Sequence, residues 1–155
     1  GHDRIFGLIG ALRHSKPPFI TVDCGTAITI NYLDGDGVFQ GGAILPGLST
    51  SLRALHERAA QLPLLMPQHT VEITGKTTAE AMTIGNYWGA CGAITMIVDR
   101  IRREVAHSEV IPIVMTGGDH ALLLPAMNSS YAISLPYMVL EGVRAIVQAQ
   151  TENNE

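Results

Sequence analysis

The chain has 155 residues, a formal net charge of −4 and a hydrophobic content of 46%. This length and apolar content suit one domain with one sizeable core, and charged residues, at 15%, are too few for a disordered chain. The ten Lys and Arg residues are scattered apart from a small group at Arg100, Arg102 and Arg103, so no basic stripe predicts nucleic-acid binding.

The sequence shows no signal for a membrane or for export. No run reaches the roughly 18 apolar residues of a membrane span, and the first residues lack the basic-then-apolar pattern of a signal peptide. Two cysteines, Cys24 and Cys91, lie in apolar stretches without metal-ligand spacing, which is typical of reduced thiols in a core. We therefore expect a cytoplasmic protein that binds neither membrane nor nucleic acid.

Apolar periodicity predicts the elements in chain order. A short amphipathic helix over residues 5–12 stops before two consecutive prolines, and a meander of three antiparallel strands follows it. Two helices come next, and then strands alternate with helices. After the first helix, the predicted ranges are strands 19–23, 27–33 and 38–45, helices 48–60 and 78–105, strand 111–115, helix 121–127, strand 132–135 and helix 139–149.

Residues near the starts of the two middle helices are typical of helix caps. The hydroxyl residues 49–51 offer capping oxygens to the helix over 48–60. Thr77 or Thr78, with Glu80 in the first turn, suits the start of the long helix. The preceding Gly75-Lys76 superficially resembles a phosphate loop, but the earlier glycine that such a loop requires is absent.

The order of elements predicts the fold class. Three antiparallel strands followed by alternating helices and parallel strands are the repeat unit of ribonuclease-H-like α/β folds. We expect a mixed sheet of about five strands with helices on both faces. The domain should span residues 1–150, and residues 151–155 should form a polar tail.

The segment around Asp23 is a candidate ligand site. An acidic residue ends a buried strand, Gly25 allows backbone N–H groups to turn outward, and the hydroxyl of Thr26 follows. Such a turn suits phosphate, because the N–H groups donate to the anion while the carboxylate holds a cation. An ordinary hairpin with side-chain-to-backbone hydrogen bonds explains the pattern equally well.

Two further segments allow both a functional and a structural interpretation. Thr116-Gly117-Gly118 stands between a strand and a helix, where backbone can approach a nucleotide or simply turn. At the start of the chain, the Asp3 carboxylate could take a proton while the Arg4 guanidinium holds a carboxylate. An acidic residue there also stabilises a helix amino terminus.

Together, in this order and spacing, these segments resemble type III pantothenate kinases of bacteria, which belong to the acetate and sugar kinase, heat-shock chaperone and actin superfamily. The resemblance covers essentially the whole chain. The matching stretches are Gly1-His2-Asp3-Arg4-Ile5, Val22-Asp23-Cys24-Gly25-Thr26-Ala27, Gly41-Gly42-Ala43-Ile44-Leu45-Pro46-Gly47, Leu52-Arg53-Ala54-Leu55, Glu57-Arg58-Ala59-Ala60-Gln61-Leu62-Pro63, Gly75-Lys76-Thr77-Thr78, Glu80-Ala81-Met82, Thr116-Gly117-Gly118 and Leu140-Glu141-Gly142.

The resemblance implies an ATP-dependent phosphorylation of pantothenate to 4′-phosphopantothenate, at the first step toward coenzyme A. It implies that Asp3 is the general base and that Arg4 binds the pantothenate carboxylate. It further implies a potassium or ammonium ion at Asp23, and magnesium bound with ATP. The implied pantothenate contacts are Gly1, His2, Asp3, Arg4 and Thr78, and the implied ATP contacts are Gly25, Thr26, Thr116, Gly117 and Gly118.

The resemblance also sets expectations about organisation. Residues 1–150 correspond to the second, carboxy-terminal, actin-like ATPase domain, and the amino-terminal domain with the first phosphate loop lies outside these residues. We therefore expect little activity from the chain alone. A homodimer is implied, and glycines 85, 89 and 92 of the long helix suit either a partner surface or close packing within the chain.

Two other functions remain open from the sequence. One is a kinase of the same superfamily that acts on a different small hydroxyl substrate. The other is a non-catalytic regulatory or accessory protein of the same family.

Overall fold

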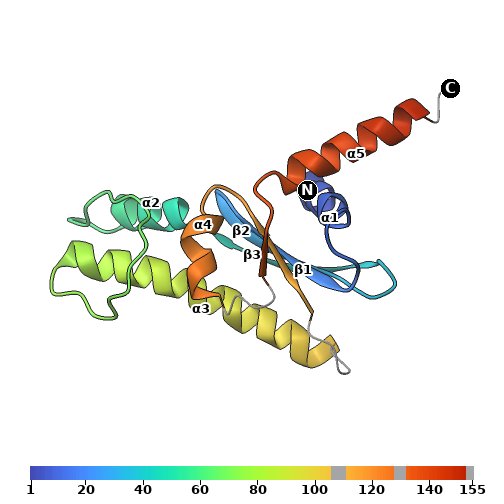
Figure 1. Cartoon of the computed structure of the whole chain (residues 1–155). Coiled ribbons are helices and arrows are strands. Elements are labelled where there is room, and N and C mark those ends of the chain that lie inside the picture. Colours follow the sequence, from blue (N-terminus) through green and yellow to red (C-terminus); the bar gives the residue numbers. More distant parts are fainter. Residues whose placement is uncertain (106–110, 128–131, 153–155) are drawn as a thin grey trace.

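A five-stranded mixed sheet organises the chain in the computed structural model (Figure 1). The structure describes residues 1–105, 111–127 and 132–152. The strands are β1 (Phe19–Cys24), β2 (Ala27–Leu33), β3 (Phe39–Pro46), β4 (Ile113–Thr116) and β5 (Ala132–Ser134). Their order is β3-β2-β1-β4-β5, in which the first three form an antiparallel meander and β4 and β5 run parallel to β1. The predicted mixed sheet is therefore confirmed.

Helices cover both faces of this sheet, as expected. They are α1 (His2–Ala11), α2 (Leu48–Arg58), α3 (Thr78–Val105), α4 (His120–Leu123) and α5 (Met138–Glu152), with a 3₁₀ turn, η1 (Leu124–Ala126), after α4. Figure 1 shows α1 and α5 on one face, and α2, α3 and α4 on the other. No helix among the described residues is both long and apolar enough to cross a membrane.

Alternating side chains of the strands divide the interior into two cores. Ile20 and Val22 of β1 face α3 and join the larger core, to which α3 contributes Ile94. Phe19 points to the opposite face and joins a smaller core with residues of α1 and with Met138 of α5. Each large apolar side chain buried in this way stabilises the fold by about 1.5 to 3 kcal/mol.

Two glycines let α1 and α5 touch backbone to backbone. A Cβ on Gly10 would overlap the carbonyl of Met138, and a Cβ on Gly142 would overlap the carbonyl of Phe6. An ion pair between His14 Nε2 and Glu141 Oε2, 2.5 Å apart, joins the same helices at the surface. Consequently α5 fixes the position of α1 against the sheet.

One local expectation from the sequence is wrong, and one of two alternatives that the sequence left open is excluded. No hydroxyl of residues 49–51 caps α2, because Gly47 is the N-cap and Thr50 instead donates to the Thr26 carbonyl at 2.6 Å. The glycines 85, 89 and 92 do not pack closely within the described chain, since a Cβ on any of them would meet nothing within 4 Å. Both results concern which groups meet in space, which sequence periodicity does not specify.

Two other local expectations, the cap of α3 and the free cysteines, are confirmed. Thr77 caps α3, because its hydroxyl accepts the Glu80 N–H at 3.2 Å while the Glu80 carboxylate accepts the N–H groups of Lys76 and Thr77. Both cysteines are buried and free. α5 continues through Glu152, two residues into the segment predicted to be a tail, and residues 153–155 lie outside the described part.

Candidate functional site

The carboxyl ends of β1 and β4 lie side by side and bring together two of the predicted segments. The strands are parallel, and Asp23 pairs with Thr116 in their register. The backbone N–H of Asp119 donates to the Cys24 carbonyl at 2.9 Å, which joins the loop after β4 to the turn after β1. Parallel strands that end together place their loops at one edge of the sheet, where ligands of open α/β sheets bind.

Gly117 fits tightly against Asp23 at this edge. Its φ of +92° is a left-handed conformation that favours glycine. A Cβ built there would lie 2.5 Å from Asp23 Oδ1 and equally close to the backbone of Cys24. The loop after β4 therefore reaches the Asp23 carboxylate only because residue 117 has no side chain.

A network of hydrogen bonds positions Arg4 on the α1 side of the sheet. The Arg4 Nε donates to Asn31 Oδ1 at 2.5 Å, and the Asn31 amide donates to the Thr21 hydroxyl at 3.2 Å. The guanidinium carbon lies 4.9 Å from the centre of the Phe39 ring. Within the described residues, Arg4 Nη2 is buried without a hydrogen-bond partner, and such an orphaned donor costs about 1 to 3 kcal/mol.

Two carboxylates, those of Asp3 and Asp23, lie close enough to interact with each other on this side of the sheet. Asp3 occupies the first turn of α1 and is exposed, whereas Asp23 is partly buried. Burial raises the pKa of Asp23, and the nearby charge of Asp3 raises that pKa further. The arrangement thus concentrates negative charge that a cation would offset. The described residues hold no group of three or more His, Cys, Asp or Glu able to bind a metal ion.

A hollow of about 520 Å³ opens beside the turn after β1. It is lined by Cys24, Gly25, Thr26, Ser49, Thr50, Arg53, Gly118 and Asp119. Burial raises the pKa of Asp119, and it raises the pKa of the Cys24 thiol to about 12 with smaller contributions from neighbouring acidic groups. A thiol that stays protonated is a poor nucleophile, so Cys24 is not expected to react with a ligand in this hollow.

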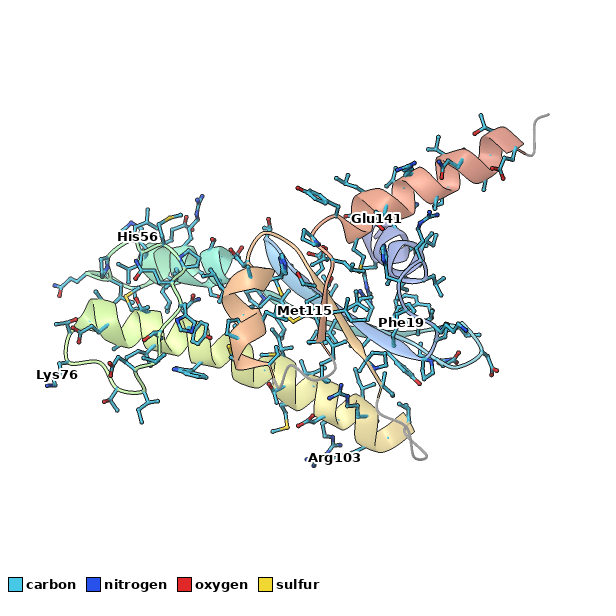
Figure 2. The ribbon with its side chains drawn as sticks, in the orientation of Figure 1. Phe19, His56, Lys76, Arg103, Met115 and Glu141 are labelled. Carbon is cyan, nitrogen blue, oxygen red and sulfur yellow. The ribbon has the colours of Figure 1, made fainter. Side chains whose placement is uncertain are left out.

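The remaining predicted residues are placed in different ways. Gly1 and His2 are exposed at the start of α1. Thr116 is buried, and its hydroxyl donates to the Pro136 carbonyl at 3.2 Å, so this side chain holds the structure together. Thr78 begins α3 at the end of the molecule remote from α1, and the neighbouring Lys76 lies far from Glu141 (Figure 2). Within one chain, Thr78 therefore lies far from Asp3.

Sequence reasoning missed four polar residues at these sites: Thr21, Asn31, Arg53 and Asp119. A signal existed for Asn31, since it is a lone amide within the otherwise apolar and β-rich run of β2. Its pairing with Thr21 depends on the strand register, which the sequence did not supply. Arg53 had no signal, because an exposed arginine on a helix is ordinary.

The strand order, the glycine loops at the edge of the sheet and the carboxylates beside them define a ribonuclease-H-like α/β domain with a polar ligand site. Two solved structures share this fold. A conserved protein from Campylobacter jejuni, described as a Baf family transcriptional activator, aligns with a TM-score of 0.71 at 22% identity over 98% of this chain and 65% of its own. The ethanolamine utilization protein EutJ from Carboxydothermus hydrogenoformans aligns with a TM-score of 0.50 at 15% identity over 89% of this chain and 53% of its own.

The sequence comparisons specify the family. The family model for type III pantothenate kinase matches residues 1–100. The type III pantothenate kinase of Listeria monocytogenes serotype 4a is 34% identical over all of this chain and 59% of its own length. Those of Paramagnetospirillum magneticum and Acidobacterium capsulatum are 39% and 35% identical over 76% and 100% of this chain, and over 45% and 56% of their own lengths.

The chain belongs to the type III pantothenate kinase family. It spans about three fifths of the length of the Listeria relative.

Proposed function

We propose that this chain supplies the pantothenate side of a kinase that uses ATP to convert pantothenate to 4′-phosphopantothenate, the first step toward coenzyme A. The observation that carries the proposal is the orphaned Arg4 Nη2, which follows Asp3 in the chain, together with the interaction of the Asp3 and Asp23 carboxylates. A ligand carboxylate would satisfy this guanidinium with charge-assisted hydrogen bonds. Asn31 and Phe39 already hold the guanidinium in place, which lowers the cost of ordering it when the ligand binds.

In the proposed reaction, Asp3 acts as the general base. The pantothenate hydroxyl oxygen attacks the γ-phosphorus of ATP, its proton passes to the Asp3 carboxylate, and ADP leaves with the electrons of the broken P–O bond. The exposure of Asp3 on the first turn of α1 lets a substrate hydroxyl approach it. A positioned carboxylate of this kind contributes roughly 10² to 10⁴ in rate.

Asp23 fits a monovalent cation such as potassium or ammonium. Its raised pKa reflects burial first and the Asp3 carboxylate second, and a positive charge there would offset both. A site with one carboxylate suits a weakly held cation. ATP and its magnesium ion would contact Gly25 and Thr26 in the turn after β1, and Gly117 and Gly118 in the loop after β4. Thr116 holds the loop after β4 in place.

The position of Thr78 supports a homodimer. If Thr78 contacts pantothenate, a second copy must bring it to the Asp3 site, because α3 begins far from α1. A mostly apolar groove of about 560 Å³ between α2 and α3 is lined by Leu55, Gly85 and Gly89 among others. Uncovered glycines and apolar side chains there suit contact with a partner.

The decisive experiment measures ADP release by the full-length gene product that contains these residues. We expect release that depends on pantothenate, rises in potassium relative to sodium, and falls by roughly 10² or more in Asp3→Asn. The matched control is Asp36→Asn, an exposed carboxylate in the turn between β2 and β3. The 155-residue chain alone should turn over little ATP.

Other outcomes would redirect the proposal. Retained ATP binding without pantothenate binding would favour a different hydroxyl substrate. Failure of the full-length protein to bind ATP would favour a regulatory or accessory role. For the dimer, mixing Asp3→Asn with Thr78→Ala subunits should restore activity that neither variant has alone, because mixed dimers contain one intact site. An unchanged mixture would contradict a shared site.

A further inference from the structure

Arg53 has no structural partner in the described chain, although it lines the hollow that contains the proposed ATP contacts. The hollow places Arg53 beside Gly25, Thr26 and Gly118. No hydrogen bond or ion pair joins the side chain of Arg53 to any residue that the structure describes. An arginine that stabilises a fold normally pairs with carboxylates or carbonyl groups, so the guanidinium is available for a ligand.

The geometry of α2 directs Arg53 toward this hollow. Leu48 and Leu52 form the buried side of the helix. Arg53 follows Ser49 and Thr50 by four and three residues, so all three share the opposite face. Thr50 is tied to the Thr26 carbonyl, which fixes that face against the turn after β1. Because helical side chains lean toward the amino terminus, Arg53 extends over the same turn.

The surroundings favour an anion with several oxygens. The first turn of α2 has no side-chain cap, so its N–H groups are not used by a capping residue. The hydroxyls of Ser49 and Thr50 line the same hollow. Asp119 is the one carboxylate among the lining residues. Burial raises its pKa and no positive charge lowers it, so Arg53 does not stabilise the Asp119 carboxylate. A phosphate group would accept hydrogen bonds from the guanidinium, which matches its geometry.

We propose that Arg53 contacts the phosphate groups of bound ATP and sets the affinity of the protein for the nucleotide. This inference rests on the proposed kinase function. Arg53 supplies a charge at the phosphates, whereas Gly25, Thr26 and Gly118 supply backbone and hydroxyl contacts. The proposal concerns binding of the triphosphate and leaves proton transfer to Asp3.

The test compares ATP and adenosine binding in the full-length gene product. Arg53→Ala should weaken ATP binding about tenfold or more and leave adenosine binding unchanged, since adenosine lacks phosphate. Arg53→Lys should recover part of the ATP affinity because it keeps the charge. The matched control is Arg103→Ala, since Arg103 is exposed near the end of α3 and does not line this hollow. In turnover assays, Arg53→Ala should raise KM for ATP and leave KM for pantothenate unchanged.

Equal ATP affinity in Arg53→Ala and the unchanged protein would overturn the proposal. A parallel loss of ATP and adenosine binding would also overturn it, because that result indicates a structural role. Failure of the kinase proposal would look different. The unchanged protein would then bind ATP, and Arg53→Ala would still reduce this binding, but no ADP release would depend on pantothenate.

Discussion

The two faces of the central sheet differ in composition, although the same strands supply both. The face toward α3 is a continuous apolar core that includes Ile20, Val22 and Ile94. The face toward α1 has a smaller apolar core and, beside it, the buried polar pair Thr21 and Asn31. Since alternate residues of one strand point in opposite directions, a single strand can serve both faces.

The two faces are therefore expected to contribute differently to folding stability and to ligand binding. Apolar burial stabilises the fold in proportion to the area removed from water. A buried polar group contributes little unless it is paired, and it costs free energy when it is not. The orphaned donor of Arg4 lies on the polar side. We therefore expect substitutions on the α3 face to change mainly stability, and substitutions on the α1 face to change both stability and ligand binding.

The largest expected effect comes from Ile94→Ala on the α3 face. Ile94 is fully buried, so the substitution removes apolar contacts and leaves a cavity. The free energy of unfolding should fall by about 3 kcal/mol, as measured by chemical denaturation. Met96→Ala on the exposed side of the same helix should change it by less than about 0.5 kcal/mol. Equal losses in the two variants would contradict the assigned core.

A smaller loss is expected from Gly10→Ala where α1 crosses α5. The added Cβ would overlap the Met138 carbonyl, so the helices must move apart at a cost of about 1 to 3 kcal/mol. The control is Gly92→Ala in α3, where a Cβ meets nothing and the better helix propensity should add about 0.5 kcal/mol. Thermal unfolding of both variants measures the contrast. A stabilising Gly10→Ala would show that the crossing is not close.

Asn31→Ala tests the polar network of the α1 face. It removes the acceptor of Arg4 Nε and the donor to Thr21, both on the buried side of the sheet. We expect a loss of about 1 to 2 kcal/mol in chemical denaturation, together with weaker pantothenate binding because Arg4 is no longer held. Gln40→Ala removes an exposed amide that donates to Asp34, and it should have little effect on either measurement. Normal pantothenate affinity in Asn31→Ala would show that Asn31 is not needed to hold Arg4 for pantothenate binding.

The smallest expected effect is a change in how stability depends on pH. Folding raises the pKa of Asp23, so its contribution is present below the usual range of aspartate and is lost as pH rises through the raised pKa. Asp23→Asn should abolish this decline, which begins above about pH 4. Asp34 should behave in the opposite sense. Its pKa is lowered, mainly because its carboxylate accepts the Val38 N–H, so its contribution is lost as pH falls.

Denaturation curves of the unchanged chain and of Asp23→Asn across a range of pH measure this effect. If Asp23→Asn and the unchanged chain show the same slope, Asp23 does not carry an unfavourable charge in the folded state.

The order of elements was predictable because each signal was local. Two prolines separated the first helix from the first strand, glycine-containing turns separated the meander strands, and Thr77 with Glu80 marked the start of α3. The predicted loop segments at Asp23 and Gly117 meet at the sheet edge because parallel strands end together, which the fold class implied.

The missed features depend on distant pairs. Asn31 reaches Thr21 through the register of β2 on β1, and Gly10 meets Met138 across most of the chain. Hydrophobic periodicity does not contain such pairings. The same limit applies to the glycines of α3, whose spacing suited either a partner surface or packing within the chain, and which the described chain leaves uncovered.

The close fit of Gly117 also restricts the evolutionary paths open to this site. Shortening Asp23 would remove one obstacle to a side chain at residue 117, yet the backbone of Cys24 would still stand 2.5 Å from it. Residue 117 must therefore remain glycine whatever residue stands at position 23. Residue 23, in contrast, can be substituted without a change at residue 117. A descendant of this protein could lose the Asp23 carboxylate in one step and keep the loop that surrounds it.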